Sequence, residues 1–402
     1  MSIRKRSWTT SKGERKEAWV ADYVDQAGKR HLKTFDRKKD ADAFHSKASV
    51  EVREGTHTAD SASVTVSKAA DLWVATCKGR DLEPTTVDAY EQHIKLHVAP
   101  FLGRVKLSQL TAPMVRDFED SLREGRPAPG ETAGAARSPA MVKRILGSLG
   151  SLLGDAQERG LVSRNVVRDL RGRRRKGVDR RAERRQKGKL KVGVDIPTRV
   201  EIKAIVEALE GKWRPILLTA VFTGLRASEL RGLRWADVDL KRSELHVRQR
   251  ADRYNEIGRP KSESGERSVP LTPMVVNALR EWKLACPKSS NDLVFPTGTG
   301  AVEYHSNIVH RGLAPAQLRA GVTVSSGEGL SAKYTGLHAL RHFYASWCIN
   351  RRVDGGLELP PKVVQERLGH SSILMTMDVY GHLFPRGDDV AEMEAAERSL
   401  MA

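Results

Sequence analysis

The sequence predicts a multidomain protein that is mainly α-helical and carries small β-sheets. The chain has 402 residues, which is enough for two or three domains of ordinary size. Apolar residues recur every three or four positions along most of it, as on one face of a helix, and strictly alternating stretches are short. Between residues 171 and 191 apolar side chains almost vanish, and such a segment cannot form a core of its own. We therefore expect folded domains on both sides of it.

The composition favours a polyanionic partner. The chain has 69 Lys and Arg residues against 50 Asp and Glu, a formal net charge of +19, and a chain this basic is typical of proteins that bind nucleic acid. The longest apolar run, Ile216–Phe222, is too short to span a membrane. No apolar stretch follows the basic start Met1–Arg6, so no secretory signal is predicted. We expect a cytoplasmic protein that binds a polyanion. An anionic membrane surface is a second possible polyanion, although no long basic amphipathic helix supports it.

Residues 1–58 predict a small sheet-plus-helix module. Side chains alternate in type on both sides of Ala27-Gly28, which predicts a hairpin. Asp36 can then cap a helix. The residues behind these predictions are Trp19, Val20, Tyr23, Val24, Leu32 and Phe35 for the strands and Ala41, Phe44, Ala48 and Val52 for the helix.

Residues 64–170 predict four helices. Leu72 and Trp73 mark the first, and a second runs from Val87 until Pro100 is expected to stop it. Thr111 opens the third, and the fourth carries apolar residues at helical spacing before Gly160.

Residues 171–196 are expected to form a basic interdomain linker. The stretch 171–191 holds twelve basic and two acidic residues, a net charge of +10. It is either a solvated charge run or a strap that follows DNA phosphates, and its place between domains favours the strap. The proposed DNA-binding residues are Arg171, Arg173, Arg174, Arg175, Lys176, Arg180, Arg181, Arg184 and Arg185.

Residues 197–402 predict a mixed, mainly helical domain. Helices are expected over 200–209, 213–222, 337–349 and 361–368, with short strands over 244–250 and 267–271. A final helix over 389–401 has an apolar face that suits either packing within the chain or docking on a neighbouring subunit.

Metal and cofactor sites are not predicted. No phosphate-binding loop, nucleophile-elbow or zinc-protease motif occurs. Asp237 and Asp239 are better explained as turn carboxylates than as a metal pair, and His305 and His310 are five apart, a spacing that does not share a helix face. The cysteines Cys77, Cys286 and Cys348 lie far apart and are expected to be free thiols.

Four segments carry candidate chemistry. Arg226, in Thr223–Leu230, follows a glycine that ends one helix, so it lies by the next helix N-terminus, where anions are favoured. Lys261 sits on a polar hairpin tip, and His338 and Arg341 share a helix face. The last segment holds His370, just after a helix-closing glycine, and Tyr380 ten residues later. From the residues alone each has an ordinary structural explanation, and Tyr344, one turn from Arg341, competes with Tyr380 as a functional tyrosine.

Taken together, these segments resemble the tyrosine recombinase family, the phage integrases and their relatives. The family pattern is T-G-x-R-x-x-E-L, a hairpin lysine before R-x-V-P-L, H-x-L-R-H, L-G-H, and a tyrosine ten residues after that histidine. All five parts occur in order between Thr223 and Tyr380. One departure is Ala339, where many relatives have aspartate, and it leaves the proposed ligands untouched.

The resemblance implies a role for each residue. Arg226 and Arg341 would hold the scissile phosphate with help from His338 and His370, Lys261 would protonate the leaving 5′ oxygen, and Tyr380 would form a 3′-phosphotyrosyl link. His338 is also a plausible base for the tyrosine. Metals and cofactors are not required.

The resemblance also implies the domain roles and the partners. Residues 1–58 would be an arm-type DNA-binding module and residues 64–170 a helical, SAM-like core-binding domain that clamps DNA together with the catalytic domain. The expected partners are double-stranded attachment sites, a homotetramer on DNA passing through a Holliday junction, and accessory bending or directionality proteins. The alternatives are DNA relaxation like that of a type IB topoisomerase and a non-catalytic DNA-binding regulator.

Overall fold

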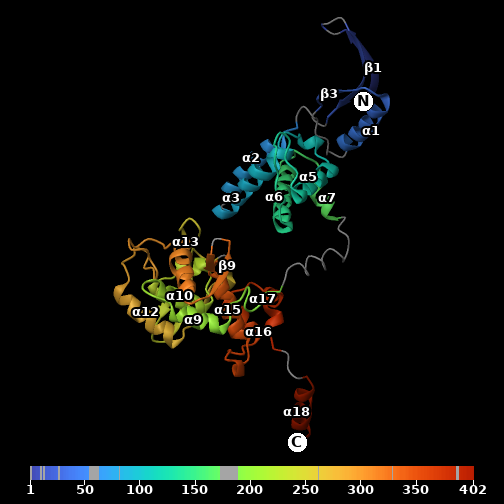
Figure 1. Ribbon diagram of the computed structural model, residues 1–402. Coiled ribbons are helices and arrows are strands. Elements are labelled where there is room, and N and C mark those ends of the chain that lie inside the picture. The colour runs from blue at the N-terminus through green and yellow to red at the C-terminus, as the bar shows by residue number, and fades with distance from the viewer. Residues whose placement is uncertain are drawn as a thin grey trace. The chain divides into compact units, whose positions relative to one another are not determined.

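The computed structural model divides into two compact units, Met1–Arg181 (unit 1) and Ala182–Ala402 (unit 2), each described by itself (Figure 1). The elements are mostly helices with small sheets, so the predicted fold class is confirmed. The structure describes residues 2–9, 11, 14–25, 28–53, 63–80, 82–172, 189–260, 262–327, 329–385 and 389–402.

Unit 1 begins with a three-stranded antiparallel sheet in the order β1-β2-β3. Strand β2 (Arg15–Val24) pairs with β3 (Arg30–Phe35) across a turn in which Gly28 has a φ of 77°, as the predicted hairpin requires. Strand β1 (Ser2–Thr9) was not predicted, because most of its side chains are polar and exposed. Helix α1 (Lys38–Arg53) contacts the sheet, with Ala41 and Ala48 buried.

The helical part of unit 1 encloses a separate core. Its elements are α2 (Val66–Gly79), α3 (Pro84–His93), η1 (Ile94–Val98), α4 (Ala99–Leu102), η2 (Leu107–Gln109), α5 (Ala112–Glu124), α6 (Pro139–Glu158) and α7 (Val166–Gly172). The Thr111 side chain caps α5, as its position predicted. Ile145, Leu149 and Leu152 of α6 are fully buried in this core, so the predicted fourth helix supplies its centre.

Pro100 does not stop the second helix, contrary to the sequence prediction. The chain stays helical from α3 through η1, a π-helical turn, into α4. In that turn the N–H of Ala99 reaches back to the carbonyl of Ile94. Proline lacks an N–H and crowds the carbonyl four residues earlier, and a widened turn relieves both problems.

Unit 2 is built around buried helices. Its helical elements are α9 (Arg199–Glu207), α10 (Trp213–Thr223), α11 (Ala227–Arg231), η3 (Trp235–Asp237), η4 (Glu263–Gly265), α12 (Pro273–Ala285), α13 (His305–Asn307), η5 (Ile308–Leu313), α14 (Ala314–Arg319), α15 (His338–Ile349), η6 (Arg352–Asp354), α16 (Pro361–Leu368), α17 (Ile373–Tyr380), η7 (Gly381–Leu383) and α18 (Asp389–Met401). Helix α10 is buried almost throughout and contacts α12 and α15. Ile196 is also fully buried in this core.

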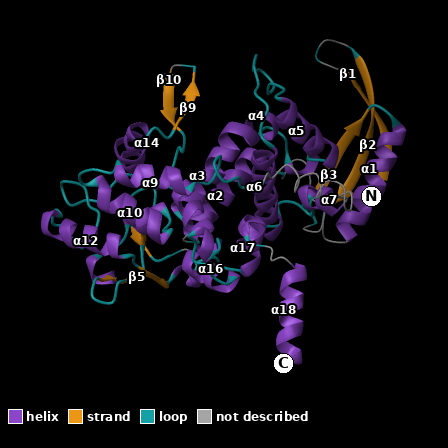
Figure 2. Ribbon diagram, turned by 60° about the horizontal axis from the view of Figure 1, so that its bottom comes forward, coloured by secondary structure: helices purple, strands orange, loops and turns teal. Residues whose placement is uncertain are grey.

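Short strands lie at the edges of this helical core. They are β4 (Val238–Asp239), β5 (Glu244–Val247), β6 (Arg250–Ala251), β7 (Ile257–Gly258), β8 (Arg267–Pro270), β9 (Thr323–Ser326) and β10 (Gly329–Ala332). Strands β4, β5 and β8 form one antiparallel sheet, and β6 pairs with β7. The β9–β10 hairpin, which was not predicted, stands out from α14 in Figure 2.

The remaining elements refine the sequence predictions. Helices α13, α14 and α17 were not predicted, since α13 and α17 are short and π-helical η5 breaks the helical period before α14. Helix α18 forms as predicted, but Val390, Met393, Leu400 and Met401 are largely exposed. The three cysteines are free, with Cys77 and Cys348 buried. Within the described parts of the chain, no helix is both long enough and apolar enough to cross a membrane.

Candidate active site

The site begins where α10 ends. Gly224 closes α10 in the left-handed conformation with a φ of 61°, and α11 starts three residues later. A side chain at Gly224 would collide with Tyr344, because an added Cβ would lie 2.4 Å from the Tyr344 ring. Only glycine therefore allows this sharp turn against α15, and the turn places Arg226 at the N-terminus of α11, as predicted.

Arg226 is held from two sides. Its Nη1 donates to Oε1 of Glu229 at 2.7 Å, and its backbone N–H donates to Oε2 of the same residue at 2.8 Å. Its Nη2 donates to the carbonyl oxygen of Gly369, beyond the end of α16, at 2.9 Å. These bonds fix the guanidinium while its side chain stays 36% exposed, so the group is both positioned and accessible.

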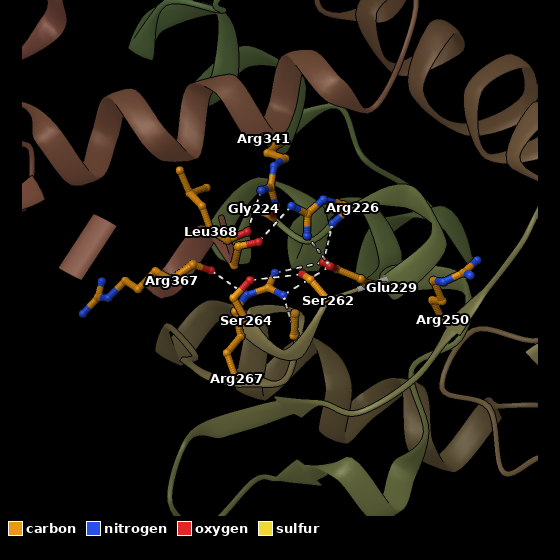
Figure 3. Close-up of polar contacts among 12 residues, drawn as sticks. Gly224, Arg226, Glu229, Arg250, Ser262, Ser264, Arg267, Arg341, Arg367 and Leu368 are labelled. Atoms are coloured by element: carbon orange, nitrogen blue, oxygen red, sulfur yellow. Dashed lines mark hydrogen bonds and ion pairs between the residues drawn. The ribbon is translucent and has the colours of Figure 1, made fainter. Parts of the chain in front are cut away.

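Glu229 is a buried carboxylate shared between two arginines (Figure 3). Arg267 of β8 donates to both of its oxygens, from Nη1 at 3.2 Å and from Nη2 at 2.9 Å. Burial alone would raise the pKa of Glu229, but the charge and hydrogen bonds of Arg267, aided by the charge of Arg226, lower it to about 2. Arg267 also donates to the carbonyl of Arg367 on α16, and so connects β8, α11 and α16.

Arg341 is the most deeply buried cation of the site, at 2% exposure. Its Nη1 donates to the Gly224 carbonyl at the end of α10 at 2.6 Å, and its Nη2 donates to the Leu368 carbonyl at the end of α16 at 2.5 Å (Figure 3). Burial and the charge of Arg226 lower the pKa of Arg341 to about 10, which still leaves it cationic at neutral pH. Carbonyl groups at two helix C-termini therefore fix the position of the Arg341 guanidinium.

His370 follows directly from the end of α16. Gly369 turns the chain in the left-handed conformation, and the backbone of His370 is tied to Gln365 in both directions. The His370 Nδ1 lies 2.9 Å from the Thr376 hydroxyl of α17. Burial and the charge of Arg341 lower the pKa of His370 to about 4, so its imidazole is neutral at physiological pH.

Tyr380 ends α17 beside these groups. It is only 2% exposed, and its ring is stacked on His370 with an interplanar angle of 5°. Its hydroxyl oxygen lies 2.7 Å from Nδ1 of His342 on α15. Burial raises the pKa of Tyr380 to about 12 even though Arg341 and Arg226 act in the opposite direction. In the free protein the phenol therefore keeps its proton.

His338 lies at the start of α15, one turn before His342. Its side chain is exposed, and its ring packs edge-on against His342 at 4.7 Å between centroids. Partial desolvation by the surrounding protein, and then the charges of Arg341 and Arg226, lower the pKa of His338. An exposed, neutral histidine next to two fixed arginines is suited to hydrogen-bond an incoming anion.

The structure brings five of the six predicted catalytic residues into one connected set: Arg226, His338, Arg341, His370 and Tyr380. Lys261 lies outside the described residues, although the chain on both sides of it is described. Of the predicted DNA-binding residues, the backbone of Arg171 belongs to α7. The other eight, from Arg173 to Arg185, lie outside the described residues.

The other residues weighed from the sequence have structural roles. Tyr344 is 1% exposed and packs against Gly224, in the core of unit 2. Asp237 pairs with Arg234 and Arg248, and Asp239 accepts two backbone N–H bonds in a turn. No cluster of metal-ligating side chains occurs among the residues described, including the stretch around His305 and His310.

Sequence reasoning missed three residues of the site: Glu229, Arg267 and His342. Signals for all three were present. Glu229 stands three residues after Arg226, the residue that precedes α11, and this is the spacing of a capping box. Arg267 lies two residues before the buried Val269 on a short strand and so shares its face of the sheet. His342 is four residues after His338 and so shares its helix face.

Comparisons with known proteins point to one family. A sequence model of the phage integrase family matches residues 198–386, and a model of the phage integrase N-terminal SAM-like domain matches residues 65–123. A tyrosine recombinase XerC-like protein of Caldanaerobacter subterraneus is 27% identical, over 90% of both chains.

Two solved structures show a similar fold. The Tn1549 transposon integrase in complex with transposon right-end DNA is 18% identical with a TM-score of 0.59, over 83% of this chain and 99% of that one. A lambda integrase from a tetramer bound to a Holliday junction is 17% identical with a TM-score of 0.52, over 91% of this chain and 95% of that one.

Fold, site and relatives together define an enzyme that cuts and rejoins DNA strands. The chain belongs to the phage integrase family and is a tyrosine recombinase, a site-specific recombinase of DNA. The family resemblance, the recombinase function and the fold predicted from the sequence are confirmed.

Glu229→Gln should remove a pH-dependent part of the stability. The folded-state pKa of Glu229 is about 2, against 4.5 for the free group, so its ionised form stabilises the fold fully above pH 4.5 and loses this effect as the pH falls toward 2. The shift corresponds to about 3 kcal/mol. Urea unfolding should therefore show Glu229→Gln destabilised by about that amount at pH 7, with the difference from wild type vanishing toward pH 2.

The matched control is Glu207→Gln, which removes an exposed carboxylate of α9 paired with Lys203 on the surface. Exposed pairs contribute at most about 1 kcal/mol, so its unfolding curve should stay close to wild type. A difference between Glu229→Gln and wild type that is constant from pH 7 to pH 2 would contradict the assigned network.

Proposed function

We propose that this recombinase breaks DNA with Tyr380 as nucleophile, forms a 3′-phosphotyrosyl link and integrates or excises a mobile element. The observation that supports this most directly is the convergence of Arg226 and Arg341, through carbonyls at the ends of α10 and α16, next to the stacked pair of His370 and Tyr380. A phosphodiester placed against the arginines would lie beside the only tyrosine that the described site contains.

The arginines supply the charge that phosphoryl transfer requires. Negative charge on the non-bridging oxygens must be stabilised in the transition state, and fixed guanidinium groups do this without reorganising. The described hydrogen bonds of Arg226 and Arg341 use their Nη atoms, and each Nη carries a second hydrogen. These hydrogens, with those of His338 and His370, would bind the phosphate oxygens.

Lys261 would protonate the leaving 5′ oxygen. Neither arginine suits that role, because a guanidinium hardly gives up a proton. The described chain that follows Lys261 is anchored close to the site, because Arg267 of β8 pairs with Glu229. The covalent link conserves the energy of the broken bond, so a second 5′-hydroxyl can attack it without ATP.

The proposed partners are double-stranded attachment sites and three further copies of the chain. Two duplexes that exchange both strands need four active sites. The solved relatives support this assembly, since one is bound to transposon end DNA and another is a tetramer on a Holliday junction. Residues 1–58 and 64–170 would contact DNA as the arm-binding and core-binding parts, and accessory bending or directionality proteins would act on the complex.

Tyr380→Phe should abolish covalent attachment to DNA. The test incubates the protein with nicked duplexes of random sequence. Cleavage next to the nick releases a short strand, so religation is prevented and the covalent adduct accumulates. The adducts are then separated on a denaturing gel. Wild type should form the adduct, and sequencing of the trapped DNA gives the core site. Tyr344→Phe is the matched control and should keep the adduct, because Tyr344 is a core residue packed on Gly224. The reverse result would overturn the nucleophile assignment.

Neutralising the linker should weaken DNA binding without regard to sequence. Replacing Arg173, Arg174, Arg175, Arg180 and Arg181 by Gln removes five charges from the 171–191 block. Every phosphate that these arginines neutralise should contribute about 0.9 to the slope of log K against log salt, so the variant should show a shallower slope while adduct formation at saturating protein persists. Fluorescence anisotropy over a salt series, on cognate and unrelated duplexes, measures this. If the variant bound only the cognate duplex more weakly, and the slope of log K against log salt did not change, the proposed contact of the linker with DNA phosphates would be contradicted.

Deleting residues 389–402 should impair assembly more than DNA binding. Helix α18 leaves Val390, Met393, Leu400 and Met401 largely exposed, and an apolar helix face on a tetrameric enzyme is suited to dock on a neighbouring subunit. The truncated protein should bind one site like wild type but form fewer two-duplex complexes, as measured by native gel electrophoresis. Unchanged complex formation and strand exchange would rule out this contact.

A further inference from the structure

The hydroxyl of Tyr380 has a defined partner, and that partner is not among the residues predicted from the sequence. His342, in the middle of α15, places Nδ1 2.7 Å from the Tyr380 oxygen. The two rings lie 5.7 Å apart and tilted, so the contact is made through the ring edge of the histidine. Tyr380 is 2% exposed and His342 is half-buried, so water has little access to this hydrogen bond.

We propose that His342 is the base that accepts the hydroxyl proton of Tyr380 as the tyrosine attacks the DNA phosphorus. This inference rests on the proposed function of Tyr380 as nucleophile. It assigns to His342 a step for which His338 is the candidate from sequence alone.

In the free site the proposed donor carries its proton and the proposed acceptor is neutral. Burial raises the pKa of Tyr380 to about 12, whereas burial, His338 and Arg341 lower the pKa of His342 to about 4. At neutral pH the phenol therefore carries its proton and the imidazole is neutral. Transfer to His342 requires the tautomer in which the imidazole hydrogen lies on Nε2, so that the Tyr380 O–H donates to an unprotonated Nδ1.

The other two histidines are placed for different tasks. The His370 ring lies parallel to the Tyr380 ring, and its Nδ1 contacts the Thr376 hydroxyl. His338 is exposed at the start of α15, and its described ring contact is with His342. A base must lie within hydrogen-bond reach of the proton that it removes, and among the described hydrogen bonds it is His342 that meets this condition.

The step balances without any further reactant. The oxygen of Tyr380 forms a bond to phosphorus, the bond from phosphorus to the 5′ oxygen breaks, and the phenolic proton moves to Nδ1 of His342. The leaving 5′ oxygen takes its proton from Lys261 in the proposed mechanism. When a 5′-hydroxyl attacks the phosphotyrosine, its oxygen bonds to phosphorus and its proton goes to Lys261. The bond from phosphorus to Tyr380 breaks, and the proton on His342 returns to the Tyr380 oxygen.

The groups around His342 explain why proton transfer from Tyr380 would require bound DNA. The charged or titratable groups that act on it are His338 and Arg341 of its own helix, Tyr380 of α17, and Asp195 before α9. His338 and Arg341 oppose its protonation and Asp195 favours it. A phosphate bound at the arginines adds negative charge nearby and so raises the proton affinity of His342, while bond formation to phosphorus makes the phenol more acidic.

The experiment measures the rate of adduct formation between pH 6 and 9 on the nicked duplex recovered from the random-sequence selection. His342→Gln keeps a hydrogen-bond acceptor but no base. Its rate at pH 7 should fall by about 10²- to 10⁴-fold, the usual effect of removing a general base. The residual rate should rise about tenfold per pH unit as hydroxide replaces the base, whereas wild type stays nearly flat. His310→Gln, an exposed histidine of the same unit, is the matched control and should behave like wild type.

A second substrate separates this role from that of the general acid. With sulfur in place of the bridging 5′ oxygen, the leaving group needs no proton, so a Lys261→Ala defect should be suppressed while the His342→Gln defect persists. Added imidazole should restore part of the rate of His342→Ala. This second variant tests the same role of His342 if the Gln variant does not fold. DNA binding by both His342 variants, measured by anisotropy, should match wild type.

The outcomes separate this inference from the proposed function. A wild-type rate in His342→Gln, a reduced rate with an unchanged pH profile in both His342 variants, or rescue of His342→Gln by the sulfur substrate would each overturn the assignment. Failure of the wild-type protein to form any adduct on Tyr380 would instead overturn the proposed function.

Discussion

Burial of the Arg341 charge is the interaction on which the site depends. A guanidinium at 2% exposure needs hydrogen-bond acceptors and compensating negative charge. Both described partners of Arg341 are backbone carbonyls, of Gly224 and Leu368, and both stand at the C-terminal ends of helices. Helix C-termini carry partial negative charge and unpaired carbonyls, so α10 and α16 together stabilise the cation without neutralising it. A carboxylate in their place would leave less positive charge for a phosphate.

The second arginine is stabilised in a different way, and the difference matters for the chemistry. Arg226 pairs with Glu229, but Glu229 is also bound by Arg267. One carboxylate thus serves two guanidinium groups, and the site keeps a net positive charge where the phosphate is proposed to bind. Because Arg267 also contacts the end of α16, the carboxylate fixes the same helix terminus that holds Arg341. The geometry of both arginines is therefore set by one shared framework.

The sequence predicted the elements that carry the site better than the contacts inside it. Periodicity and helix-ending glycines located α10, α15 and α16, and motif spacing located the residues at their ends. Glu229, Arg267 and His342 were missed although each lies within a motif. Their roles depend on contacts with distant residues: Arg267 binds Glu229 and His342 contacts Tyr380, and each pair is 38 residues apart in the sequence. Such pairings result from tertiary packing, and the spacing of apolar residues along the sequence does not predict them. Pro100 failed as a helix stop for a local reason, since a π-turn can absorb a proline.

The free site is held in a state that is cationic yet chemically inactive. Burial keeps Tyr380 protonated and keeps His342 and His370 neutral, so neither a phenolate nor an imidazolium is present until an anion arrives. A phosphate bound by the arginines would add negative charge beside His342 and His370, and this charge would raise the pKa of both histidines. If Tyr380 is the nucleophile, as proposed, the burial that keeps its hydroxyl protonated in the free protein would make its activation depend on bound DNA. In the proposed mechanism, that coupling would restrict the reaction to a phosphate bound by Arg226 and Arg341.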